Sequence, residues 1–158
     1  MELDFSADIL WDGENGGQIA LRDLAPLKID ALPEFGGKGE QPFQDELFFA
    51  SIGGCLLTTF LYVRRKRKSP LVHLKVSVNG GIALQGPQGY RLTSVDATIY
   101  VETLKGYENK AEECVRLTRS FCHLTRLLEM VVPFTLSSKI DCVEDRQGTS
   151  NGSHGPLR

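Results

Sequence analysis

Two cysteines, Cys55 and Cys122, are the side chains of this 158-residue chain that could carry out chemistry together. Each stands near the middle of a segment with the pattern of a buried helix. One interpretation is that both are packing residues, because free cysteine is among the most frequently buried residue types. The other is a redox pair: the thiolate of one cysteine attacks a peroxide, and the second thiol captures the resulting sulfenic acid as a disulfide. That chemistry needs a nearby cation to lower the pKa of the first thiol, and a path for the substrate.

The other candidate groups give weaker patterns. Cys114 lies about 12 Å before Cys122 on the same predicted helix, too far for a disulfide, so we interpret Cys114 and Cys142 as packing residues. His123 follows Cys122, but adjacent helical side chains point in different directions, and no partner stands at metal-ligand spacing. The five basic residues at 64–68 are interpreted as a solvated helix end, with anion binding as the alternative.

Composition predicts one domain over residues 1–144 and a tail at 145–158 that has nothing to bury and is expected to be disordered. A net charge of -2 gives no general case for a nucleic-acid partner. The N-terminus lacks a basic stretch followed by an apolar one, which favours a cytoplasmic location. Four cysteines without metal-ligand spacing indicate free thiols or redox chemistry and predict no metal site.

A helix predicted over residues 41–68 must position Cys55. Pro42 suits its first turn, and Asp45 and Glu46 complement the positive end of the helix dipole. Apolar side chains cover it nearly all round, so we expect it to be buried, and its polar end argues against a membrane span. This helix needs more cover than one small sheet provides, which predicts a homodimer.

Alternating apolar residues predict strands before and after this helix. The expected strands begin near Leu3, Ile19, Leu27, Val72, Ile82, Val95 and Val132. A second helix is predicted over residues 109–130, with Asn109 as its N-cap. Its apolar stripe consists of Val115, Phe121, Leu124 and Leu128. The class is α+β, with a mainly antiparallel sheet and helices on one side.

Two motifs resemble the signatures of the OsmC/Ohr family, the osmotically inducible and organic hydroperoxide resistance proteins. The first comprises PEFGG from Pro33, DELFFA from Asp45 and the Gly54-Cys55 pair, and the second is RSFCHL around Cys122. The predicted element order agrees with the family, so the resemblance covers residues 7–143. The glycines before Cys55 and the basic run after it are most similar to the OsmC-like branch.

The resemblance implies a sheet wrapped around two long central helices in an intertwined homodimer, with active sites at the subunit interface. It also implies thiol-dependent reduction of organic hydroperoxides without metal, haem, flavin or any other cofactor. On this basis Cys55 is the peroxidatic residue and Cys122 the resolving thiol. A dithiol reductant, such as a lipoyl group, then reduces the disulfide.

Family enzymes pair the first cysteine with an arginine and a glutamate. The arginine position falls near Gln18; Arg22 would lie on the same strand face and could substitute by reaching further, or it is an exposed strand residue. Asp45 and Glu46 both fit the glutamate position. Glu46 is nine residues before Cys55, on the opposite face of a regular helix and roughly 13 Å away.

Contact between Glu46 and Cys55 therefore requires a helix distortion, a bridging arginine or the partner subunit, and dipole compensation is the simpler role for Glu46. The leading hypothesis is a cytoplasmic thiol peroxidase. The competing hypothesis, favoured by the displaced arginine, is a non-enzymatic OsmC-like protein that binds a small apolar ligand at the dimer interface.

Overall fold

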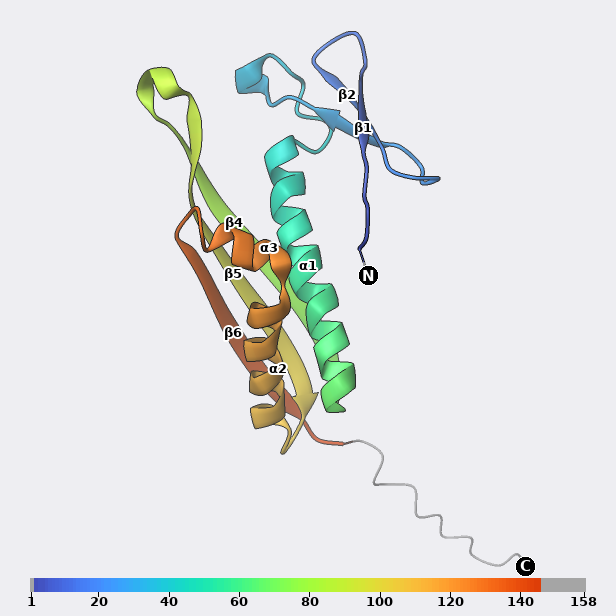
Figure 1. Cartoon of the computed structure of the whole chain (residues 1–158), viewed down its shortest axis with the longest axis vertical. Coiled ribbons are helices and arrows are strands. Elements are labelled where there is room, and N and C mark those ends of the chain that lie inside the picture. Colours follow the sequence, from blue (N-terminus) through green and yellow to red (C-terminus); the bar gives the residue numbers. More distant parts are fainter. Residues whose placement is uncertain (1, 146–158) are drawn as a thin grey trace, which may run out of the picture. The chain divides into compact units, whose positions relative to one another are not determined.

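The computed structural model describes residues 2–145, so the predicted tail lies outside the described residues from 146 onward. The chain forms two compact units, the first ending at Ser51 and the second beginning at Ile52 (Figure 1). The strands are β1 (Asp8–Trp11), β2 (Gly16–Ala20), β3 (Leu27–Asp30), β4 (His73–Leu84), β5 (Tyr90–Leu104) and β6 (Phe134–Val143). The helices are α1 (Gln44–Arg67), α2 (Glu108–Phe121) and α3 (His123–Leu128), with short 3-10 turns at Pro33–Phe35 and Gly86–Gln88. The predicted α+β class is confirmed.

The N-terminal unit contains an antiparallel sheet of β1, β2 and β3, in that order. Strand β1 begins at Asp8, later than predicted. Asp8 pairs with Ala20 at the end of the ladder, and β2 ends at Ala20. The prediction that Arg22 continues this strand is therefore wrong. Arg22 lies in a turn with a φ of 49°, a left-handed conformation that side chains other than glycine rarely adopt.

The C-terminal unit contains a second sheet in the order β4, β5, β6. Strands β4 and β5 are antiparallel, whereas β6 runs parallel to β5, so this sheet is mixed. The two strands predicted at Val72 and Ile82 are one strand, β4, whose register shifts at a bulge between Gly81 and Ile82. Parallel strands need a crossover connection, and α2 and α3 supply it.

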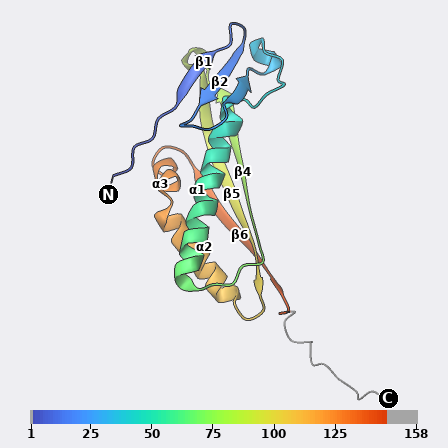
Figure 2. The same ribbon diagram turned by 90° about the vertical axis from the view of Figure 1, so that its right-hand side faces the viewer.

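One face of this second sheet is covered by helices (Figure 2). Alternate side chains of the central strand are buried there: Val95, Ala97, Ile99, Val101 and Thr103. From α1, the buried side chains are Ile52, Leu56, Phe60 and Val63. The helix lies close to β4 at Gly53, where an added Cβ would stand 3.3 Å from Val78 Cγ2. The core therefore fixes the segment of α1 that carries Cys55.

Helix α1 begins at Gln44 rather than at residue 41, and Pro42 precedes it. The Glu46 carboxylate accepts a hydrogen bond from the backbone N–H of Phe43 at 2.9 Å, which satisfies one of the free donors at the helix start. Only four of its residues are buried, so the expectation of burial all round is wrong for the single chain. By length and composition alone α1 could span a membrane, a test that core helices of globular proteins also pass.

The predicted second helix is interrupted at Cys122, whose backbone is extended (φ -70°, ψ 110°) between α2 and α3. The N-cap of α2 is Tyr107 with no side-chain cap, so the capping box predicted at Asn109 is absent. The predicted apolar stripe is also wrong in part, because Phe121 is 62% exposed. The stripe that is buried instead contains small and polar residues: Ala111, Cys114, Thr118 and Thr125.

Candidate active site

Cys55 lies in the middle of α1, half-buried, on the turn that follows Gly53 and Gly54. The next residue, Leu56, is fully buried in the core, so the backbone at this point is held firmly against the sheet. Thr58 and Thr59 lie one turn further along the helix, and the hydroxyl of Thr58 donates a hydrogen bond to the Gly54 carbonyl at 2.9 Å. Cys55 therefore stands on an ordered helix with its thiol partly open to solvent.

Cys122 occupies the break between α2 and α3 rather than the middle of a helix. Its N–H still donates to the Thr118 carbonyl, and its own carbonyl accepts from the N–H of Arg126. The chain thus leaves one helix and enters the next through a single extended residue. Cys122 is fully buried.

The two thiols meet at this break. Cys122 Sγ lies 2.8 Å from Cys55 Sγ and donates a hydrogen bond to it, and both cysteines are free. Of the two, Cys55 is accessible and Cys122 is not, so a molecule arriving from solvent meets Cys55 first. The arrangement places the two thiols where they could form a disulfide.

His123 also faces Cys55, although the sequence interpretation gave His123 no role. Its Nδ1 lies 3.8 Å from Cys55 Sγ. On a regular helix Cys122 and His123 would be separated by about 100° and could not both reach one atom. The extended backbone at Cys122 removes that restriction. No glycine or proline marks this break in the sequence, so local sequence signals would not have found it.

The electrostatic surroundings of Cys55 favour its neutral form. Burial raises the pKa of the Cys55 thiol, and the hydrogen bond with Cys122 raises it further. The backbone N–H of Leu124 and the hydroxyl of Thr59 act in the opposite direction, because both can donate to a thiolate. The net direction is upward, so Cys55 requires a further group if it is to react as a thiolate near neutral pH.

The other predicted site residues belong to the N-terminal unit. Arg22 lies in the turn after β2, and Glu46 caps the start of α1. Neither belongs to the unit that contains the thiol pair. The observed bond to Phe43 gives Glu46 a structural role at the helix start, in addition to its favourable position in the dipole field.

Cys114 and Cys142 have different surroundings. Cys114 is buried in the stripe of α2, as predicted for a packing residue, and burial raises its pKa. Cys142 is exposed on β6, so its predicted packing role is wrong. A hydrogen bond with the Glu108 carboxylate is the main cause that raises the pKa of the Cys142 thiol.

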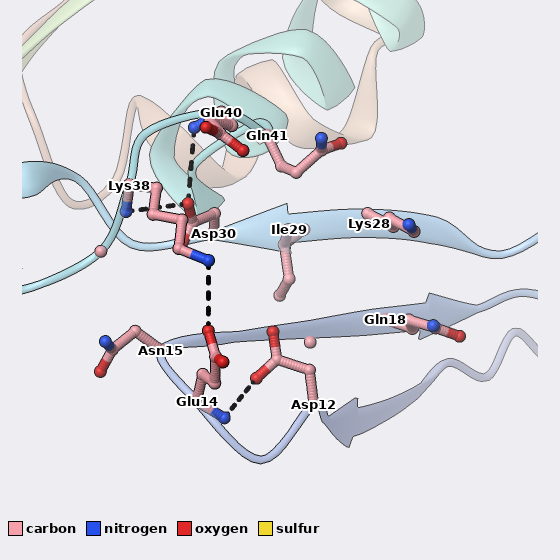
Figure 3. Close-up of a pocket in the computed structure, with 12 residues that line it drawn as sticks. Asp12, Glu14, Asn15, Gln18, Lys28, Ile29, Asp30, Lys38, Glu40 and Gln41 are labelled. Atoms are coloured by element: carbon pink, nitrogen blue, oxygen red, sulfur yellow. Dashed lines mark hydrogen bonds and ion pairs between the residues drawn. The ribbon is translucent and has the colours of Figure 1, made fainter.

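The hollows in the described part of the chain include two with different linings. One, of about 450 Å³, is lined by Thr58, Thr59, Tyr62 and Phe121. Phe121 directly precedes Cys122, and Thr58 is three residues after Cys55. The other, of about 290 Å³, belongs to the N-terminal unit and is lined by charged side chains that pair with one another (Figure 3). There Asp30 accepts the backbone N–H groups of Lys38 and Glu40, and the Lys38 ammonium pairs with Glu14 at 3.3 Å.

In this hollow, Asp30, Lys38 and Glu14 therefore already have partners within the N-terminal unit. These interactions hold the loop before α1. Among residues 2–145 no three histidine, cysteine or acidic side chains gather as metal ligands. The basic run also has internal partners: Arg67 pairs with Glu113, and the Lys66 ammonium lies over the Tyr62 ring. The thiol pair is therefore the candidate reactive site in the described part of the chain.

The protein is of the α+β class, and a cysteine on α1 faces a cysteine at the α2–α3 break. Comparison with known proteins gives the family. The family profile described as "OsmC-like protein" matches residues 37–137, so the chain belongs to the OsmC-like family. Comparison with curated proteins gives no match.

Several solved structures share the fold. An organic hydroperoxide resistance protein OsmC from Legionella pneumophila has 22% identity and a TM-score of 0.72, covering 87% of this chain and 97% of its own. An OsmC-like protein from Mycoplasma pneumoniae has 12% identity and a TM-score of 0.78, with coverages of 89% and 99%. An organic hydroperoxide resistance protein from Elizabethkingia anophelis has 14% identity and a TM-score of 0.72, with coverages of 89% and 100%. The family resemblance inferred from the motifs is confirmed.

Proposed function

We propose that this protein is a cytoplasmic thiol peroxidase that reduces organic hydroperoxides through Cys55 and Cys122, without a bound cofactor. The observation that carries the proposal is the 2.8 Å separation of the two sulfurs across α1 and the α2–α3 break. Membership of the OsmC-like family supports it, since solved relatives are described as organic hydroperoxide resistance proteins.

The reaction has two steps at the sulfurs. The Cys55 thiolate attacks the outer oxygen of the hydroperoxide; an S–O bond forms, the O–O bond breaks, and the alkoxide leaves to become an alcohol. Cys122 then attacks the sulfenic sulfur, forming the disulfide and releasing water. The accessible Cys55 suits the first step and the buried Cys122 the second. An external dithiol, of the lipoyl type, returns the pair to its reduced state.

We also propose that the active unit is a homodimer. Several large apolar side chains of the C-terminal unit are exposed in the single chain: Tyr62, Phe121, Leu127, Met130 and Val131. Exposed apolar groups gathered near a site are typical of an interface. In such a dimer Arg22 and Glu46 are the candidates to complete the site around Cys55, as their counterparts do in the family.

The test is mass spectrometry of the purified protein after one equivalent of cumene hydroperoxide, with and without a dithiol. We expect a Cys55–Cys122 disulfide that the dithiol reverses. Cys142 is the internal control, because it is exposed but has no thiol partner among the contacts described for it. Oxidation of Cys55 no faster than that of Cys142 would contradict the proposal.

A non-enzymatic role in binding a small apolar ligand is the second candidate. The raised pKa of Cys55 and the hollow beside Tyr62 and Phe121 favour it. The two functions differ in turnover. A peroxidase loses peroxide consumption in Cys55→Ser, whereas a binding protein consumes no peroxide before or after that substitution.

A further inference from the structure

His123 is placed at Cys55 by the same backbone break that places Cys122. It is the first residue of α3, a short helix anchored through the buried side chains of Thr125 and Leu128. Its Nδ1 lies 3.8 Å from Cys55 Sγ, within reach of a weak hydrogen bond to sulfur. The residue itself is exposed, so a proton that it takes up can exchange with solvent.

The hydrogen bond that Cys55 accepts from Cys122 leaves the proton of Cys55 available to His123 when Nδ1 of the imidazole carries no hydrogen. Cys122 Sγ donates its proton to Cys55 Sγ. The Cys55 proton must then point elsewhere, and the imidazole nitrogen is a basic acceptor beside it. The Leu124 N–H and the Thr59 hydroxyl, which also interact with the Cys55 thiol, are not bases near neutral pH. Both stabilise a thiolate once the proton has left, and neither can remove it.

We infer that His123 is a catalytic residue, the proton acceptor that converts Cys55 to its thiolate and then donates the same proton to the leaving alkoxide. Only the second step, in which His123 donates the proton to the alkoxide, rests on the proposed peroxidase function. Protons balance: His123 takes one from Cys55 and gives it to the alkoxide, so the products are a sulfenic acid and an alcohol. Cys55 is oxidised by two electrons, and the hydroperoxide is reduced by two.

This role addresses the displaced arginine of the site. The family resemblance implies an arginine at the first cysteine, and by spacing that position falls near Gln18 in this chain. A histidine in contact with the sulfur supplies a base where a fixed cation is missing from the expected position. Cys–His pairs activate thiols in this way in other enzymes, because the imidazolium that forms stabilises the thiolate.

The primary test is the alkylation rate of Cys55 by iodoacetamide at neutral pH, which depends on the thiolate and not on peroxide chemistry. The background is Cys122→Ser with Cys142→Ser, and mass spectrometry identifies the labelled residue. We expect His123→Ala to slow alkylation about tenfold, the change in thiolate produced by one pKa unit. His123→Gln should be equally slow, since an amide is not a base. Added imidazole should restore part of the rate in His123→Ala.

The control is His73→Ala, which removes an exposed histidine at the start of β4 and should alkylate at the parental rate. Circular dichroism confirms that each variant is folded, and His123→Gln replaces His123→Ala if the latter unfolds. Alkylation at the parental rate in both His123 variants would overturn the inference. In the otherwise unmodified protein, peroxide consumption should fall about 100-fold in His123→Ala, because the acid for the alkoxide is lost as well.

The two proposals fail separately. A wild-type protein that consumes no hydroperoxide, yet alkylates more slowly after loss of His123, would refute the peroxidase and retain the Cys–His pair. A protein that consumes hydroperoxide at the same rate with and without His123 would retain the peroxidase and refute the catalytic role of His123.

Discussion

Oxidation of the thiol pair should raise the stability of the protein, and the size of the effect follows from chain topology. A Cys55–Cys122 bond links residues that are 67 positions apart in the chain. In the chain-entropy treatment, closing a loop of that length lowers the entropy of the unfolded state. The free energy of unfolding at 25 °C rises by about 4.4 kcal/mol as a result. Because the reduced protein already holds the two sulfurs side by side, little of this gain is offset by rearrangement of the folded state. For a domain of this size the melting temperature should rise by roughly 9–18 °C.

The assay is thermal unfolding, followed by circular dichroism, of the reduced protein and of protein oxidised with cumene hydroperoxide. Mass spectrometry verifies the disulfide, and protein concentration is held constant because a dimer melts at a concentration-dependent temperature. Cys55→Ser and Cys122→Ser, treated in the same way, should show no rise. Oxidised protein that melts at or below the temperature of the reduced protein would refute the reasoning. It would mean that the bond forms only after the α2–α3 break has rearranged.

Further outcomes are expected from single changes elsewhere. Leu56→Ala, at a fully buried position of α1, should cost about 2–5 kcal/mol in urea unfolding; a cost below about 1 kcal/mol would contradict the packing described for this helix. Glu46→Ala should cost about 0.5–1 kcal/mol by removing the acceptor for the Phe43 N–H, while Glu46→Gln should retain most of it. Burial raises the pKa of Cys114 above its unfolded value near 9.0, so its stabilising contribution is complete below that pH and is lost as pH rises through the folded value. Stability measured across this alkaline range should therefore fall less steeply in Cys114→Ala than in the parent.

The central helix could be predicted because several independent signals agree on it. Its apolar residues recur over many turns, and acids stand at its start and bases at its end. Its first residue was misplaced because Pro42 fits the first turn as well as the position before it. Its burial was overestimated because periodicity shows which faces are apolar but not which of them this single chain covers. The predicted dimer offers cover for the remaining apolar surface.

The second helix shows what periodicity cannot detect. The residues that face the core there are small or polar, such as Ala111, Thr118 and Thr125, so the buried stripe does not stand out as apolar. Phe121, which does stand out, is exposed. The break at Cys122 has no local cause in glycine or proline. It depends on tertiary packing of α3, which a linear pattern does not encode.

The break between α2 and α3 determines which side chains reach Cys55. A continuous helix would direct one of two adjacent side chains toward Cys55 and turn the other away by about 100°. One extended residue at position 122 lets the chain present two different functions to the same sulfur: a thiol that can close a disulfide and an imidazole that can accept a proton. A packing role for the cysteines would need the first contact at most and would leave the second unexplained. The simultaneous approach of Cys122 and His123 to a half-exposed thiol is therefore the observation that favours the proposed redox chemistry at Cys55 over the filling of a core.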